Sequence, residues 1–149
     1  MNALTNPVFA LYQPESRYDS TGSRAVRVGS LNEWQVEALK KIVGLESLGH
    51  NWNSYGSVPP SAWVIGTAID FICKVPFDNP PMPRIMPVAG GGIQMEWEKG
   101  RRELEVEIHP DTTIEVLQAI NGRPLNPDEV SSPAPRAAVE RLLTWLSVD

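Results

Sequence analysis

Acidic side chains alternate with apolar ones in two neighbouring segments, and this pattern is the one in the chain best suited to chemistry. The acidic positions are Glu96, Glu98, Glu103, Glu105 and Glu107, and they are followed by His109 and Asp111. Facing residues on paired strands lie about 5 Å apart, so several carboxylates would crowd together. Such crowding raises the pKa of some carboxyl groups or attracts a divalent cation. One interpretation is therefore a small metal-dependent hydrolase or nuclease that uses Glu105, Glu107 and His109 as metal ligands.

A simpler interpretation is that the glutamates only keep an exposed sheet face in contact with water. Antiparallel sheets commonly bury one face and solvate the other. No Asp-x-Asp or Glu-x-x-His spacing accompanies the glutamates. A third interpretation is a docking face, because an acidic surface steers and selects a basic partner without any catalytic geometry. The partner contacts would then be Glu96, Glu103, Glu105 and Glu107.

Aromatic and amide side chains are concentrated in the segment from His50 to Gly56. Aromatic rings provide contact area and amides provide directional hydrogen bonds, a combination typical of binding surfaces. We therefore include Trp52, Asn53 and Tyr55 among the candidate partner contacts. The alternative is that Trp52 and Tyr55 fold back and close the junction between two helices.

Signatures of nucleophilic and cofactor chemistry are missing from the sequence. There is no Gly-x-Ser-x-Gly elbow, phosphate loop or Gly-x-Gly-x-x-Gly motif. The single cysteine, Cys73, accompanies the apolar stripe of an expected helix and is interpreted as a small buried hydrophobic residue. We expect no catalytic residue and no cofactor.

The alternating segments predict a β-hairpin, with a turn at Lys99-Gly100 or one residue later. Either turn keeps the apolar side chains of both strands on one face. A third strand is expected over 112–119, and Gly90 to Gly92 is expected to form a turn. The proline-rich segments 76–87 and 121–135 are expected to be an extended connector and a loop.

Three helices are expected, over 30–48, 61–75 and 135–147, from apolar residues three and four positions apart. Ser30 and Glu33 have the spacing of a capping box at the start of the first helix. Residues 1–29 are interpreted as an N-terminal arm, and 30–149 as one domain. The expected fold is α+β: a three- or four-stranded antiparallel meander packed on one face by two or three helices, the first two at least.

Charge and hydropathy limit the classes of partner. The 149 residues include 13 Lys plus Arg and 18 Asp plus Glu, which gives a net charge of −5. Nucleic-acid binding needs clustered cationic side chains, so a nucleic-acid-binding regulator is the least favoured alternative. No apolar run approaches the length of a membrane span, and a cytoplasmic protein is expected. The expected partner is another protein with a basic surface, and a second copy of the chain is an alternative.

Several short motifs together resemble a group of small uncharacterised bacterial proteins. The motifs are Asn-Trp-Asn-Ser-Tyr-Gly at 51–56, Pro-Ser at 60–61, Gly-Gly-Ile-Gln-Met-Glu-Trp at 91–97 and Glu-Leu-Glu-Val-Glu-Ile at 103–108. The resemblance covers about residues 35–110 and implies a bacterial or phage origin and a compact α+β domain. It transfers no catalytic residue. We therefore favour a non-enzymatic protein-binding module, such as the antitoxin, immunity or inhibitor component of a conflict system.

Overall fold

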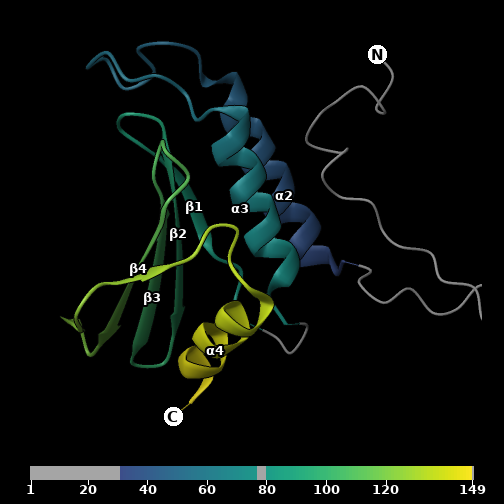
Figure 1. The fold of residues 1–149 in the computed structure, drawn as a ribbon, viewed down its shortest axis with the longest axis vertical. Coiled ribbons are helices and arrows are strands. Elements are labelled where there is room, and N and C mark those ends of the chain that lie inside the picture. The colour runs from purple at the N-terminus through teal and green to yellow at the C-terminus, as the bar shows by residue number, and fades with distance from the viewer. Residues whose placement is uncertain (1–30, 77–79, 149) are drawn as a thin grey trace, which may run out of the picture.

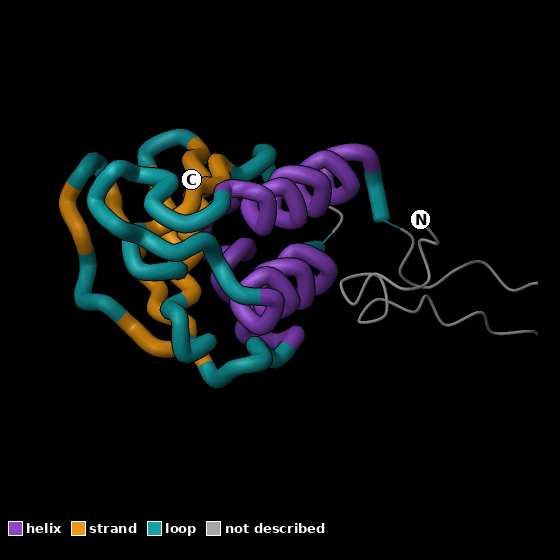
Figure 2. Tube along the Cα trace, turned by 90° about the horizontal axis from the view of Figure 1, so that it is seen from above, coloured by secondary structure: helices purple, strands orange, loops and turns teal. Residues whose placement is uncertain are grey.

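The computed structural model of the chain describes residues 31–76 and 80–148, so the expected arm at 1–29 lies outside the described residues. Within those ranges the chain forms a sheet covered on one face by helices, which Figure 2 shows as two layers. The expected α+β class with an antiparallel sheet is confirmed. The sheet has six strands in the described residues, rather than three or four. None of the described helices is long and apolar enough to cross a membrane.

The strands follow one another as a meander in which β1 (Arg84–Val88), β2 (Gly92–Lys99), β3 (Arg102–Ile108) and β4 (Ile114–Ile120) are neighbours (Figure 1). Two short strands, β5 (Arg123–Pro124) and β6 (Asp128–Val130), both pair with β4. The segments expected to be only connector and loop therefore supply the additional strands. Pro87 is compatible with β1 because this strand pairs only with β2, and an edge strand tolerates the missing N–H.

The turn between β2 and β3 lies at Gly100-Arg101, the later of the two expected positions. Lys99 pairs with Arg102, and Met95 pairs with Val106. Gly100 has φ +60°, a backbone conformation that costs glycine little. At the other end of β2, Gly90 and Gly91 have φ +93° and +105° and form the expected turn after β1.

Three α-helices are described: α2 (Glu33–Gly44), α3 (Ala62–Lys74) and α4 (Arg136–Ser147), with a 3-10 helix η2 (Leu45–Leu48) after α2. Phe71 on α3 packs on Trp97 of β2 with ring centroids 6.0 Å apart. Arg102 of β3 holds α4, because its Nη1 donates to the Trp145 carbonyl at 2.7 Å and its guanidinium lies over the indole ring. Helix α2 packs chiefly on α3 and meets the sheet mainly at the edge strand β1. The helices in direct contact with the central strands are therefore α3 and α4, rather than the first two.

The capping box of α2 lies two residues later than expected. Asn32 is the N-cap and accepts from the Gln35 N–H, while the Gln35 side chain accepts from the Asn32 N–H. Asn and Gln satisfy the same backbone donors as Ser and Glu, so the helix begins at Glu33. Gln35 is fully buried, and its Nε2 also donates to the carbonyls of Ile72 and Val75 at 3.1 and 3.3 Å. One side chain thus joins the start of α2 to the end of α3.

Replacing Gln35 by leucine is expected to lower the free energy of unfolding by about 2–3 kcal/mol. Leucine has a similar volume but cannot donate to the Ile72 and Val75 carbonyls, of which Ile72 keeps only the Val75 N–H as a donor. Urea denaturation of the wild type and the variant measures the difference. The control is Glu37→Leu on the exposed side of the same helix, which should change stability by less than about 0.5 kcal/mol. Equal effects of the two substitutions would contradict the role given to Gln35.

Candidate acidic docking face

The outer face of the sheet is formed by the side chains that alternate with the buried apolar ones. On β2 and β3 the buried positions include Met95, Trp97, Leu104 and Val106. The intervening residues therefore point away from the helices. We define the acidic face as the outward glutamates of the three central strands: Glu96, Glu98, Glu103, Glu105, Glu107 and Glu115.

The register places carboxylates of the acidic face directly opposite one another. Glu96 pairs with Glu105, Glu98 with Glu103, and Glu107 with Glu115. Like charges in facing positions destabilise a sheet, each pair by a few tenths of a kcal/mol up to roughly 1 kcal/mol. Arg84 of β1 offsets one of these charges through an ion pair with Glu96.

Glu105 lies near the centre of the acidic face, between Glu96 on β2 and Leu117 on β4. Partial burial raises the pKa of its carboxyl group above the usual value, and the neighbouring charges of Glu96, Glu107 and Glu115 raise it further. The negative charges of the face therefore act on one another, as the crowded pattern predicts.

A depression of about 400 Å³ is hollowed into one end of the acidic face. Glu96, Glu98, Glu103 and Glu105 contribute to its wall, and Arg84 also borders it. Apolar residues complete the lining, namely Pro81, Met82, Trp97, Leu104, Leu117 and Ala119. The depression thus combines several carboxylates with an apolar surface.

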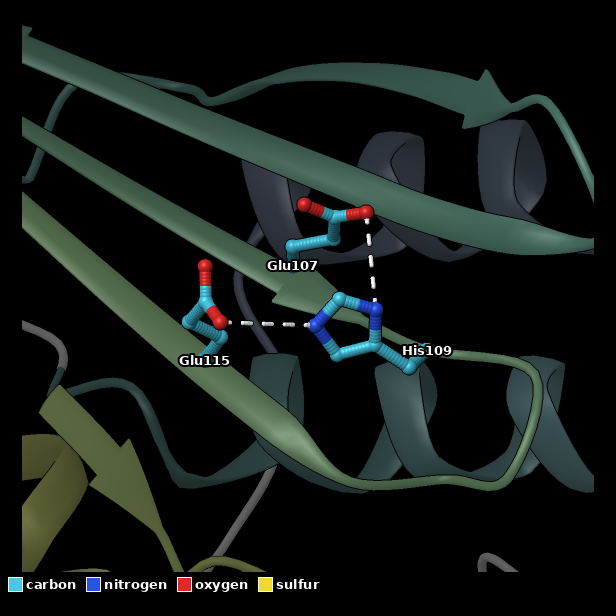
Figure 3. Close-up of side chains that lie close together, drawn as sticks. All are labelled: Glu107, His109 and Glu115. Atoms are coloured by element: carbon cyan, nitrogen blue, oxygen red, sulfur yellow. Dashed lines mark ion pairs between the residues drawn. The ribbon is translucent and has the colours of Figure 1, made fainter. Parts of the chain in front are cut away.

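His109 lies at the opposite end of the acidic face, between two carboxylates (Figure 3). Its Nδ1 is 3.7 Å from Glu107 Oε1, and its Nε2 is 3.8 Å from Glu115 Oε2. The turn after β3 orients it, because the His109 N–H donates to the Thr113 carbonyl and Asp111 accepts from both the N–H and the hydroxyl of Thr113. These bonds from Thr113 lower the pKa of Asp111.

One of the three metal ligands expected from the sequence differs in the structure. Glu107 and His109 do lie together, but the third nearby carboxylate is Glu115 rather than Glu105. Glu115 was not singled out in the sequence, although its position between Ile114 and Val116 continues the same alternation. Arg84 was also missed, since proline-rich sequence surrounds it.

The candidate residues of the aromatic loop 50–56 differ in their surroundings: two form hydrogen bonds within the loop and one is exposed to solvent. Trp52 donates from Nε1 to the Val58 carbonyl at 3.0 Å, and the Asn53 side chain bonds to Ser57 and accepts from the Tyr55 N–H. These two residues therefore shape the loop. Tyr55 instead projects into water with 91% of its surface exposed, so it does not close a helix junction.

The loop reaches the same end of the sheet as His109. A Cβ atom built on Gly91 would lie 3.3 Å from Val58 Cγ2 and 4.0 Å from Pro110 Cγ, so all three residues meet at this end. Pro110 directly follows His109. The structure brings the base of the aromatic loop beside the turn that carries His109, whereas the glutamate-lined depression is at the other end of the sheet.

Comparisons of the chain with protein-family models, curated proteins and solved structures give no match. The fold and the acidic face are therefore the observations from which a function can be inferred.

Glu105→Gln is expected to stabilise the fold near pH 7 by a few tenths of a kcal/mol up to about 1 kcal/mol. Because the folded-state pKa is raised, the folded protein binds the proton more tightly than the unfolded chain, and this carboxyl group favours folding less as pH rises. The higher stability of the variant relative to the wild type should thus disappear near pH 3, where the Glu105 carboxyl group is protonated in both the folded and the unfolded state. Urea denaturation at the two pH values measures this, and a destabilised variant at pH 7 would contradict the assignment.

Cys73 is expected to react slowly with iodoacetamide at pH 8. Burial raises the pKa of its thiol from 9.0 to about 11, with the charge of Asp70 adding to the effect. The thiolate fraction is then about a hundredfold smaller than for an ordinary cysteine. Because a thiolate of higher pKa is also more nucleophilic, alkylation of the native chain should be about tenfold or more slower than alkylation of the same chain in urea. Similar rates would show that the thiol is freely ionised.

Proposed function

We propose that the chain is a non-enzymatic binding module that docks a basic segment of another protein on its acidic face. The observation that supports this proposal is the direct opposition of glutamates across β2, β3 and β4. A face that served only to contact water would gain stability from Lys or Arg in half of these positions. Retaining the repulsion is the kind of local conflict that typically accompanies a functional surface.

The lining of the depression favours arginine as the residue that docks there. Its carboxylates match the guanidinium group, which makes paired hydrogen bonds with them. The apolar side chains of Met82, Leu117 and Ala119 suit the hydrocarbon stem. Arg84 already forms an ion pair with Glu96 from within the chain. An arginine-bearing partner would repeat that contact at Glu98, Glu103 and Glu105.

The spacing of the carboxylates favours an extended partner segment. Glu103, Glu105 and Glu107 follow one another at two-residue intervals along β3, which corresponds to about 6.8 Å. Side chains on one face of an extended peptide repeat at the same interval. A segment with arginine at alternate positions would therefore place successive guanidinium groups beside successive carboxylates.

The alternative functions have less support from the site. Phosphates would be repelled by the acidic face, which disfavours nucleic acid. A hydrolase needs a substrate cleft beside its metal, and the depression does not include His109, Glu107 or Glu115. The role of Tyr55 as a further partner contact remains a prediction, as does a setting in a bacterial conflict system.

Isothermal titration with a synthetic peptide in which arginine alternates with serine tests the proposal. The triple variant Glu98→Gln, Glu103→Gln, Glu105→Gln should bind it about 3- to 150-fold more weakly, because three exposed ion pairs contribute roughly 0.6–3 kcal/mol together. Glu96 is left unchanged so that its ion pair with Arg84 persists. Binding to the wild type should also weaken as salt concentration rises.

Two controls separate docking from general attraction of charges. The first is Glu37→Gln, Glu46→Gln, Glu140→Gln, which removes the same charge from exposed helical positions and should preserve affinity. The second is a peptide of identical composition with its arginines in one block, which should bind more weakly than the alternating peptide. Equal losses in the two triple variants, or equal affinities of the two peptides, would overturn the proposal.

A further inference from the structure

The end of the acidic face that lies away from the depression contains a mixed set of donor groups. Glu107 and His109 come from the end of β3 and its turn, and Glu115 comes from the facing position on β4. One donor atom from each residue lies within 4.8 Å of the others. The imidazole distinguishes this cluster from the directly opposed pair Glu98 and Glu103, which belongs to no group of three metal-ligating side chains among the described residues.

We propose that Glu107, His109 and Glu115 bind a divalent transition-metal ion of the Zn²⁺ class. The ion takes one ring nitrogen and one oxygen from each carboxylate, and water completes its coordination. Imidazole nitrogen suits Zn²⁺, whereas Mg²⁺ and Ca²⁺ prefer sites made of oxygen alone. Zn–N and Zn–O distances are about 2.0–2.2 Å in tetrahedral sites, so two ligand atoms lie about 3.3–3.6 Å apart. Binding would therefore draw together donor atoms that now lie within 4.8 Å of one another, chiefly by rotation of the half-exposed Glu115 side chain.

The surroundings of the cluster also favour a cation. Glu107 and Glu115 face each other directly, Glu129 of β6 pairs with Glu115 on its other side, and Glu105 lies two residues before Glu107. Among the described residues, the ion pairs of Glu107 and Glu115 are both with His109. A bound dication would neutralise the facing charges and connect β3 to β4 across the turn at 109–113. It would therefore stabilise the folded chain, by an amount that rises with the logarithm of the ion concentration once that exceeds Kd.

Titration of the wild type with Zn²⁺ alone, followed by calorimetry, is the test. We expect one saturable site, a rise in the thermal unfolding midpoint with Zn²⁺, and no displacement by millimolar Mg²⁺. His109→Ala, Glu107→Gln and Glu115→Gln should each weaken binding at least about tenfold, since loss of even an outer-shell partner of a metal ligand costs that much. The absence of saturable binding would overturn the proposal.

The matched control is the double variant Glu98→Gln, Glu103→Gln, which removes an opposed carboxylate pair from the same face and should bind Zn²⁺ as the wild type does. His50→Ala removes the chain's other histidine, which lies in the aromatic loop, and should also have no effect. Zn²⁺ binding that survives His109→Ala, or that is lost equally in the control variants, would contradict this site. Because no peptide is present, failure here would leave the docking proposal unaffected, and the reverse also holds.

Discussion

The pairing register of β2, β3 and β4 determines what meets on both faces of the sheet. Side chains alternate with a period of two, so a shift of one residue would exchange the buried and exposed sets. The turn at Gly100-Arg101 aligns Trp97 with Leu104 and Met95 with Val106 under the helices. The same alignment necessarily places glutamate opposite glutamate outside. Burial of the apolar side chains thus maintains an electrostatic arrangement that is unfavourable by itself.

A bound cation would reduce the electrostatic repulsion between the facing glutamates of the acidic face. Glu105 responds to it through its raised pKa, and Arg84 relieves it locally by pairing with Glu96. The two ends of the face suit different kinds of cation. One end has carboxylates around an apolar depression, and the other has His109. The first end suits an arginine side chain and the second suits a metal ion. Both proposals follow from the same excess of negative charge.

The sequence was sufficient to predict the hairpin of β2 and β3, because the alternation of apolar and acidic residues in these two strands is nearly perfect. It also predicted α3, whose start at Ser61 and end before Pro76 are clear local signals. Strands β1, β5 and β6 were missed because each lies in proline-rich sequence and is stabilised by pairing with β2 or β4 rather than by its own composition. Gln35 was missed for a similar reason, since its partners lie 37 and 40 residues away.

Prediction of the site depended on the same distinction between local and distant contacts. The glutamates of β2 and β3 were identified correctly as one face, since they share a hairpin. The proximity of Glu115 to His109 depends on the β3–β4 register, which the sequence did not specify. The internal hydrogen bonds of Trp52 and Asn53 likewise became visible only with the loop conformation, which leaves Tyr55 as the exposed aromatic residue of that loop.

The central claim is that the acidic face is the surface on which a basic segment docks. The most direct test is a two-dimensional ¹H–¹⁵N NMR titration of the wild-type chain with the alternating arginine peptide. The account predicts saturable shift changes concentrated in amides of β2, β3 and β4, with Glu98, Glu103 and Glu105 among the largest. Changes concentrated in α2, α3 or the 50–56 loop, or spread evenly over the surface, would contradict it.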